Sequence, residues 1–251
     1  MTREHAIIDL GAWLDSPAGR CLLDWELAQL DEALVDVFGF HALQLGLPEL
    51  DGLRANRMPQ RWLAHDGRQW VQAPPQAPAL HCLPEALPFP DQSLDLVLLP
   101  HALETSADPH QTLVEAARVL RPEGRLVVLG FNPVSLWMLR QRLGRLRANL
   151  GLRRQPLYLP EPGEAIGYWR LRDWMRLVQL EPERARFGCY RLPARGEAWL
   201  RRWAWMEAVG ARWWPVFGAV YLLQAVKRVR GMRMVGLAPA RGAARRAAPA
   251  V

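Results

Sequence analysis

A strand–helix–strand pattern between residues 94 and 131 constrains the fold more than any other feature of this sequence. "LDLVLL" (94–99) and "RLVVLGF" (125–131) are continuous apolar runs, as expected of strands that are covered on both faces. Between them, Asp108 can cap a helix that has Pro109 at its first position, and Gln111 completes a capping-box pattern. Strand, helix and strand at this spacing form a βαβ unit, which predicts an α/β fold with a parallel sheet.

Further helices and strands are predicted on both sides of this unit. Residues 22–38 form an amphipathic helix that Gly39 would stop, with one apolar face made by Leu23, Leu27, Leu30, Leu34 and Phe38. Strands are predicted at "HALQLG" (41–46), "QRWLAHD" (60–66) and "ALHCL" (79–83). After the central unit we expect helices over residues 134–150, 168–180 and 197–209, and strands over residues 183–192 and 217–226.

The composition favours one globular domain and argues against several other classes of protein. With 251 residues, of which 50% are hydrophobic, the chain can bury a large core. Cys21, Cys82 and Cys189 lack the spacing of a metal site and suit free thiols in a reducing compartment. The N-terminus has no apolar core of a signal peptide, and the longest nearly apolar run, Trp213 to Val226, has 14 residues, whereas a spanning helix needs about 20. We therefore expect a cytoplasmic protein without a metal site.

The net charge of +7 has local origins. Eight basic residues and no acid follow Glu207, and six arginines lie between Arg140 and Arg154, whereas residues 1–207 carry 24 basic and 25 acidic groups. A basic face of this kind could meet phosphate or an anionic membrane surface. No RNA-binding motif accompanies the arginines, so a nucleic acid is not the expected partner.

Residues 82–133 resemble the class I S-adenosylmethionine-dependent methyltransferases of type 11. In that family a stretch similar to "EALPFPDQSLDLVLL" links the third and fourth strands, and a phrase like "RVLRPEGRLVVLGFNP" leads into the fifth. The resemblance implies a Rossmann-like fold, in which a mostly parallel seven-stranded sheet has helices on both faces and ends in an antiparallel hairpin. It also implies S-adenosylmethionine as the cofactor. "GFNPVSLW" with "YLPEPGE" is similar to a proteobacterial subgroup with a degenerate glycine loop.

This resemblance divides the chain into five parts. We expect an N-terminal helical segment (1–38), a cofactor-binding half (39–133), a helical cap over the acceptor site (134–170), a C-terminal half that completes the sheet (171–230) and a disordered basic tail (231–251).

The cofactor crevice is expected beyond the carboxyl ends of the parallel strands. In the family the first strand ends in an acid and continues into a loop with glycines at alternate positions. Here Gln44 stands at the acid and Gly46 at the first glycine, but Pro48 and Leu50 replace the other two. Asp66 falls where an acid would hold the ribose hydroxyls. Leu83 falls where an aspartate often binds the adenine amine, and Pro84 and Pro100 follow the third strand and end the fourth.

Two further residues are candidates for catalysis. His101 follows the fourth strand, where the family lines the methionine end of the cofactor or the acceptor, and Asn132 follows the fifth and could orient an acceptor. Methyl transfer depends mainly on in-line positioning, and a base helps only if the acceptor must lose a proton. A capping or partly buried histidine and a turn-forming asparagine before Pro133 are the structural alternatives. Glu104 could donate or accept in the crevice, or be an exposed helix acid.

The leading prediction is thus an S-adenosylmethionine-dependent methyltransferase with a small-molecule acceptor. Two rivals stay open: a catalytically inactive binding or interaction module of the same fold, and a peripheral membrane or nucleic-acid binder that uses the arginine-rich segments. The tryptophans near residues 199–214 could form an aromatic pocket, although core packing is their default role. The leucine-striped, arginine-flanked helix over 134–150 could be a lid, a membrane-surface helix or a solvated helix packed on the domain.

Overall fold

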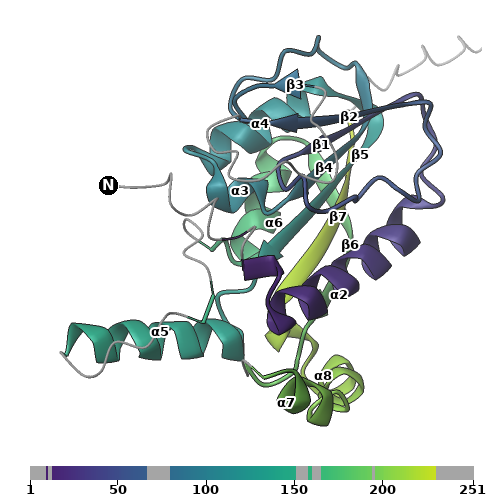
Figure 1. Cartoon of the computed structure of the whole chain (residues 1–251). Coiled ribbons are helices and arrows are strands. Elements are labelled where there is room, and N and C mark those ends of the chain that lie inside the picture. Colours follow the sequence, from purple (N-terminus) through teal and green to yellow (C-terminus); the bar gives the residue numbers. More distant parts are fainter. Residues whose placement is uncertain are drawn as a thin grey trace, which may run out of the picture.

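A single twisted sheet organises the protein. The computed structural model describes residues 10, 13–66, 80–150, 158–159, 165–193 and 196–229. Its sheet has seven strands in the order β3-β2-β1-β4-β5-β7-β6, with helices on both faces (Figure 1). The strands are β1 (His41–Leu45), β2 (Gln60–His65), β3 (Leu80–His81), β4 (Leu94–Pro100), β5 (Leu120–Phe131), β6 (Leu180–Gly188) and β7 (Val220–Lys227). The helical elements are α2 (Pro17–Leu34), α3 (Ala102–Thr105), α4 (Pro109–Val119), α5 (Leu136–Asn149), α6 (Tyr168–Leu177), α7 (Glu197–Arg202), α8 (Met206–Trp213) and the short η1 (Pro215–Phe217).

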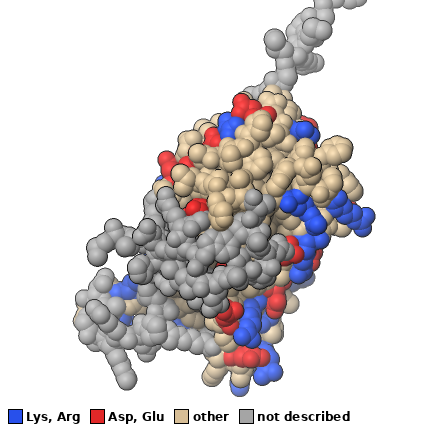
Figure 2. Space-filling model, turned by 45° about the horizontal axis from the view of Figure 1, so that its top comes forward, with Lys and Arg blue, Asp and Glu red and all other residues tan. Residues whose placement is uncertain are grey.

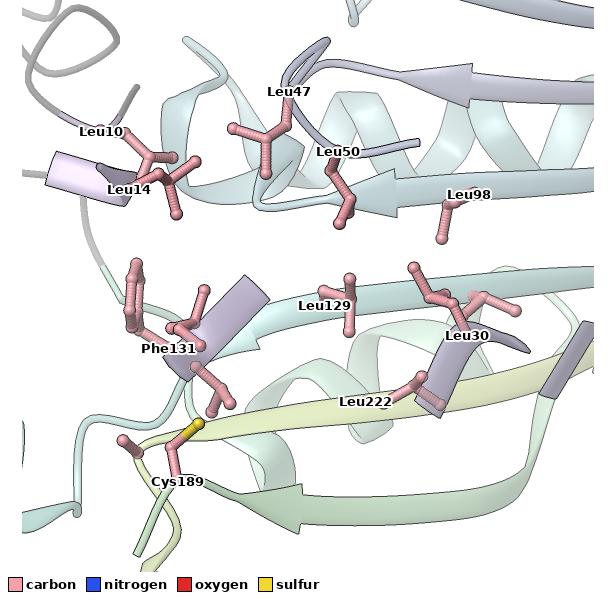
Figure 3. Packing of buried hydrophobic residues seen from close by; sticks show 14 of the residues in the cluster. Leu10, Leu14, Leu30, Leu47, Leu50, Leu98, Leu129, Phe131, Cys189 and Leu222 are labelled. Carbon is pink, nitrogen blue, oxygen red and sulfur yellow. The ribbon is translucent and has the colours of Figure 1, made fainter. Parts of the chain in front are cut away.

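The pairing of the strands confirms the predicted sheet. β1, β2, β3, β4 and β5 pair in parallel, and β7 runs antiparallel to both β5 and β6. Alternate side chains enter two cores. Leu98 and Leu129 pack with α2 on one face, whereas Val97 and Val128 pack with α4 and α6 on the other. Figure 3 shows Leu30 of α2 among Leu98, Leu129 and Leu222 of the sheet.

The expected N-cap of α4 is present, but the capping box predicted with Gln111 is not. Asp108 Oδ1 accepts hydrogen bonds from the backbone N–H groups of His110 and Gln111, both at 3.0 Å, and Pro109 begins α4. The N–H of Asp108 itself donates to Glu85 Oε1 at 3.0 Å. The acceptor for the N–H of Asp108 is therefore Glu85, in the turn before β4, and not the Gln111 side chain, so this bond connects that turn to the start of α4.

Helix α2 differs in register from its predicted apolar face. Its buried row repeats every four residues and contains an acid, and its members are Ala18, Leu22, Glu26, Leu30 and Leu34. Leu23 and Leu27 are only partly buried. The prediction that Phe38 belongs to this face is wrong: the helix ends at Leu34, and Phe38 is 74% exposed.

The segment after β6 corrects two further expectations. The single helix expected over 197–209 is broken into α7 and α8, and core packing is wrong for Trp199, Trp205, Trp213 and Trp214, all of which are exposed. The inner side of this segment is formed instead by Leu200, Met206 and Gly210. At Gly210 the backbone lies so close to the ring of Tyr190 that an added Cβ would be 2.4 Å from it.

Two further features of the described residues are the distribution of their charged side chains and the hydrophobicity of their helices. Basic and acidic side chains lie near one another on the face in Figure 2. Among the ion pairs of the described residues, Arg228 lies within 4 Å of both Glu181 and Glu183. None of the helices in the described ranges is long and apolar enough to cross a bilayer. The predicted tail, 231–251, lies outside the described residues.

Candidate functional site

The candidate crevice lies at the carboxyl ends of three neighbouring strands. Leu45 of β1 pairs with Ala64 of β2, and Gln44 pairs with Leu98 of β4, so these strands end at one edge of the sheet. The loop after β1, the Asp66 that follows β2 and the His101 that follows β4 therefore belong to the same edge. Parallel α/β sheets bind ligands at such an edge.

The loop after β1 turns at Gly46. Its φ of +87° is in a region that glycine adopts readily and other residues rarely do. Its N–H donates to Ala64 O at 2.8 Å, which joins the loop to β2. An added Cβ would lie 3.6 Å from its nearest neighbour, an ordinary contact, so the backbone angle and not crowding explains the glycine. Gly46 thus meets the requirement for a tight turn at the end of the first strand.

The Gln44 side chain holds this loop from inside. Its amide nitrogen Nε2 donates to the carbonyls of Gly46, Leu47 and Leu50 at 3.3, 3.1 and 2.7 Å. Its oxygen Oε1 accepts from the N–H of Gly52 at 3.1 Å. The side chain is buried, so its hydrogen-bonding groups are directed to the loop backbone. An acid at this position could not donate these bonds.

The rest of the loop is anchored by leucines. Leu47, Leu50 and Leu53 are buried in the core cluster that α2 covers. Figure 3 shows Leu47 and Leu50 directed toward the same core as Leu98. Of these three leucines, Leu50 is the one at a position where the sequence comparison expects a glycine of the family.

We expect the exchange Gln44→Glu to destabilise the protein, although it restores the acid typical of the family. A carboxylate would face three carbonyl oxygens without a proton to donate, and buried unsatisfied groups of this kind cost about 1–3 kcal/mol each. The free energy of unfolding should fall by about 2–3 kcal/mol in urea denaturation. The control exchange Gln60→Glu, at an exposed position where β2 begins, should have little effect. Equal stability of the two variants would contradict this account of the loop.

The other expected cofactor residues vary in accessibility. The Asp66 side chain is 14% exposed, with its Oδ1 3.4 Å from His65 Nδ1. Leu83 is 45% exposed beyond β3, Pro84 is half-buried and Pro100 is buried at the end of β4. Asp66 and Leu83 therefore retain surface with which a ligand could make contact, whereas Pro100 can contribute only to the floor.

His101, which directly follows β4, belongs to a buried polar cluster. Its Nδ1 is 2.9 Å from Glu104 Oε2, and its Nε2 is 2.8 Å from Glu26 Oε1 on α2. All three side chains are at most 3% exposed. Glu104 Oε1 also accepts from the N–H of Phe131 at 2.5 Å, so the cluster connects α2, the end of β4 and the end of β5.

The charges of this cluster favour a protonated imidazole. Although burial opposes the charge, the carboxylates of Glu26 and Glu104 outweigh it and raise the pKa of His101 to about 10. Burial also raises the pKa of Glu104, because it outweighs the hydrogen bond from His101. A buried imidazolium at neutral pH has no free lone pair and no access to an acceptor, so this environment suits a positioning role better than that of a general base.

Asn132 has a similar structural environment. Its Nδ2 donates to the carbonyls of Val216 and Gly218 at 2.7 and 2.9 Å, and its Oδ1 accepts from Val134 N at 3.2 Å. The buried amide thus fastens the end of β5 to the turn before β7. Within the described residues no group of three or more His, Cys, Asp or Glu side chains could hold a metal ion.

One member of the buried cluster was not predicted. Glu26 lies on an N-terminal helix, 75 residues before His101. The only signal in the sequence is that an acid interrupts a row of apolar residues spaced four apart. The structure brings several of the predicted site residues to one edge of the sheet, namely Gln44, Gly46, Asp66 and His101. Asn132 lies along the same edge, directly after β5.

Comparisons with known proteins agree with this architecture. Residues 61–128 match the family model described as a methyltransferase domain. Over 177 residues the chain is 31% identical to the uncharacterised protein YafS of Escherichia coli, which covers 70% of this chain and 68% of YafS. Over 48 residues it is 54% identical to the ubiquinone/menaquinone biosynthesis C-methyltransferase UbiE of Hahella chejuensis, but this match covers only 19% of each protein. A SAM-dependent methyltransferase from Archaeoglobus fulgidus has the same fold, with a TM-score of 0.56 and 14% identity over 82% of this chain and 94% of that one.

Proposed function

Because the chain belongs to the class I S-adenosylmethionine-dependent methyltransferase family, we propose that it transfers a methyl group from this cofactor to a small-molecule acceptor. The observation that supports the proposal is a partly buried acid, Asp66, which directly follows β2 and keeps 14% of its side chain exposed, together with the Gly46 turn after the neighbouring strand β1. When bound, S-adenosylmethionine supplies an electrophilic methyl group, so the protein has mainly to position the acceptor in line with it.

The residues present would suit the adenosine end of the cofactor, whereas at its methionine end Gln44 replaces the acid typical of the family. Asp66 would accept hydrogen bonds from the ribose hydroxyls, Gly46 would let the backbone approach the ligand, and Leu83 with Pro84 would cover the adenine ring. Pro100 would form part of the floor. At the methionine end Gln44 would act through the loop that it holds, since its amide is directed to that loop's backbone.

His101 and Asn132 would act as positioning residues in this proposal. His101 fixes the end of β4 against α2 through Glu26, and Asn132 fixes the end of β5 against the turn that leads into β7. Both strand ends border the crevice, so small displacements of either would alter the alignment of the acceptor with the methyl group. The expected cap over 134–170 and the other boundaries, 1–38, 39–133, 171–230 and 231–251, remain predictions.

Calorimetric titration of the full chain with S-adenosylhomocysteine tests this function. We expect saturable binding of about one ligand per chain with a Kd in the micromolar range, roughly −8 kcal/mol. Asp66→Asn should weaken binding about tenfold, because it removes charged acceptors from the ribose hydroxyls. The control Asp173→Asn changes an exposed acid on α6 and should leave the Kd unchanged. Absence of binding by the wild-type chain would favour the inactive binding module.

A further inference from the structure

Helix α5 presents an apolar stripe to solvent. Four leucines of α5, and Leu150 directly after its last residue, repeat at spacings of three and four residues, which places them on one face of a helix. Their exposed fractions range from 42% to 67%, and they are Leu136, Leu139, Leu143, Leu146 and Leu150. Isolated exposed leucines are common on protein surfaces, but a continuous stripe of five is typical of a surface that binds a partner or a membrane.

The orientation of this stripe is set by the opposite face of α5. Trp137 is fully buried and donates from Nε1 to Arg191 O at 2.7 Å. One turn further along, Gln141 Nε2 donates to Leu159 O at 3.1 Å, and its Oε1 accepts from Tyr158 N at 2.9 Å. On a helix of 3.6 residues per turn these two side chains lie nearly opposite the leucines. The polar and aromatic anchors therefore hold α5 with its leucine stripe outward, and Figure 1 shows the helix extending from the body of the protein.

A second apolar patch lies on the segment from α7 to η1. Its large side chains are between 40% and 73% exposed, and they are Trp199, Trp205, Trp213, Trp214, Val216 and Phe217. Tryptophan is enriched where proteins meet the headgroup region of a bilayer, because its ring is apolar while its N–H can be hydrated. This composition is therefore typical of a membrane-interface anchor.

The two patches belong to the same end of the molecule. Phe131, the last residue of β5, and Gly188, the last residue of β6, both pair with Val220 of β7. Helices α5 and α7 follow these two strand ends, and Figure 1 shows α5, α7 and α8 together below the sheet. Hydrogen bonds from Trp137 and Arg140 to the carbonyls of Arg191 and Pro193 join the two segments.

The charge around the stripe is basic. Helix α5 contains four arginines and no acid. Arg142 and Arg147 are exposed and flank the leucine stripe on either side. A helix with an apolar face bordered by arginines can insert its leucines among acyl chains while its guanidinium groups meet anionic headgroups.

We propose that α5 and the α7–η1 segment together form a docking surface for an anionic lipid bilayer. A second copy of this chain fits the surface less well. Pairing α5 with its symmetry mate would bring two sets of arginines together without an acid on either helix to neutralise them. A bilayer with anionic lipids covers the leucines and tryptophans and compensates the arginines at the same time.

Vesicle co-sedimentation tests this surface on the full chain without cofactor, so the result is independent of the proposed methyl transfer. We expect binding to vesicles of phosphatidylcholine with phosphatidylglycerol, and much weaker binding to vesicles of phosphatidylcholine alone. The exchange of both Leu139 and Leu143 to serine should weaken binding about tenfold or more, and Arg142→Gln with Arg147→Gln should do the same. All four side chains are exposed, so these variants should keep the thermal unfolding temperature of the wild type.

Matched controls exist at the opposite edge of the sheet. Leu177, 74% exposed at the end of α6, and its neighbour Arg176 precede the start of β6, far along the sheet from Gly188. Leu177→Ser and Arg176→Gln should leave vesicle binding unchanged. Absence of wild-type binding to both kinds of vesicle, or stripe variants that bind like the wild type, would overturn the proposal. So would a wild-type dimer in sedimentation that the serine variant converts to monomers, if neither binds vesicles.

Discussion

Replacing His101 by leucine is expected to lower the free energy of unfolding by about 3–5 kcal/mol, the range found when one partner of a buried ion pair is removed. The leucine would leave Glu26 and Glu104 facing a buried apolar side chain, and Glu26 Oε2 already has no hydrogen-bond partner among the described residues. Urea denaturation at neutral pH measures the loss.

The matched control is His110→Leu. This histidine is exposed on α4 and contacts the edge of the Trp174 ring, so the same chemical change there should cost less than about 1 kcal/mol. If the His101 variant lost no more stability than the His110 variant, the buried cluster would not be what fastens α2 to the ends of β4 and β5.

Raising the pH is expected to destabilise the wild-type protein by about 1.4 kcal/mol per pH unit, from the ordinary pKa of histidine, 6.5, up to about pH 10. In this range the folded protein keeps the proton on His101 and the unfolded chain has lost it. The stabilisation is therefore fully present below pH 6.5 and disappears as the pH rises through the folded pKa. Burial also raises the pKa of Glu104. As the pH rises above the ordinary pKa of a glutamate, the unfolded chain loses this proton before the folded protein does, so the free energy of unfolding falls there as well.

Denaturant titrations across this pH range test the assignment. His110→Leu should keep the wild-type slope, whereas His101→Leu should lose the part due to the imidazolium. If His101→Leu is too unstable to measure, Glu26→Gln provides a second variant. Removing one of the two carboxylates lowers the pKa of His101, so the alkaline loss of stability should end at a lower pH. A wild-type stability that stays constant between pH 7 and about 10 would contradict a protonated His101.

The elements that local sequence patterns determine were predicted well. The caps of α4 and the apolar runs of β4 and β5 lie within a few residues of the side chains that stabilise them, and the structure confirms these three elements and the parallel sheet. Glu26 could not be assigned, because its role depends on a histidine that the fold brings from 75 residues away. An acid among buried apolar positions conflicts with the local hydrophobic pattern, and only a partner distant in sequence, here His101, explains its burial.

The altered loop after β1 illustrates a second limit. The sequence matches Gln44 to the acid of the family, and in the structure this residue precedes Leu45, the last residue of β1. The match could not show that the Gln44 amide would bind three carbonyls of its own loop, because the path of the loop depends on where Leu47 and Leu50 pack. The hydrogen bonds of the Gln44 amide and the burial of Leu47 and Leu50 therefore depend on the same path of the loop.

Hydrophobic periodicity also could not show which face of α5 and of α8 would be exposed. A leucine stripe has the same spacing whether it faces a core or a partner, so the pattern of residues 134–150 predicted a helix without indicating which face would be covered. The structure distinguishes the two cases because Trp137 and Gln141 occupy the inner face. The same holds for the tryptophans, whose inner neighbours are Leu200, Met206 and Gly210.

The most direct test of the central claim is a crystal structure of the full chain grown with S-adenosylhomocysteine. The account predicts ligand density at the carboxyl ends of β1, β2 and β4, with the ribose hydroxyls at hydrogen-bond distance from the Asp66 carboxylate. Gln44 should still hold its loop carbonyls in that complex. Ligand density elsewhere on the protein, or a crystal grown at saturating ligand in which the side chains of Leu47 and its neighbours fill this position, would contradict a cofactor site at this edge of the sheet.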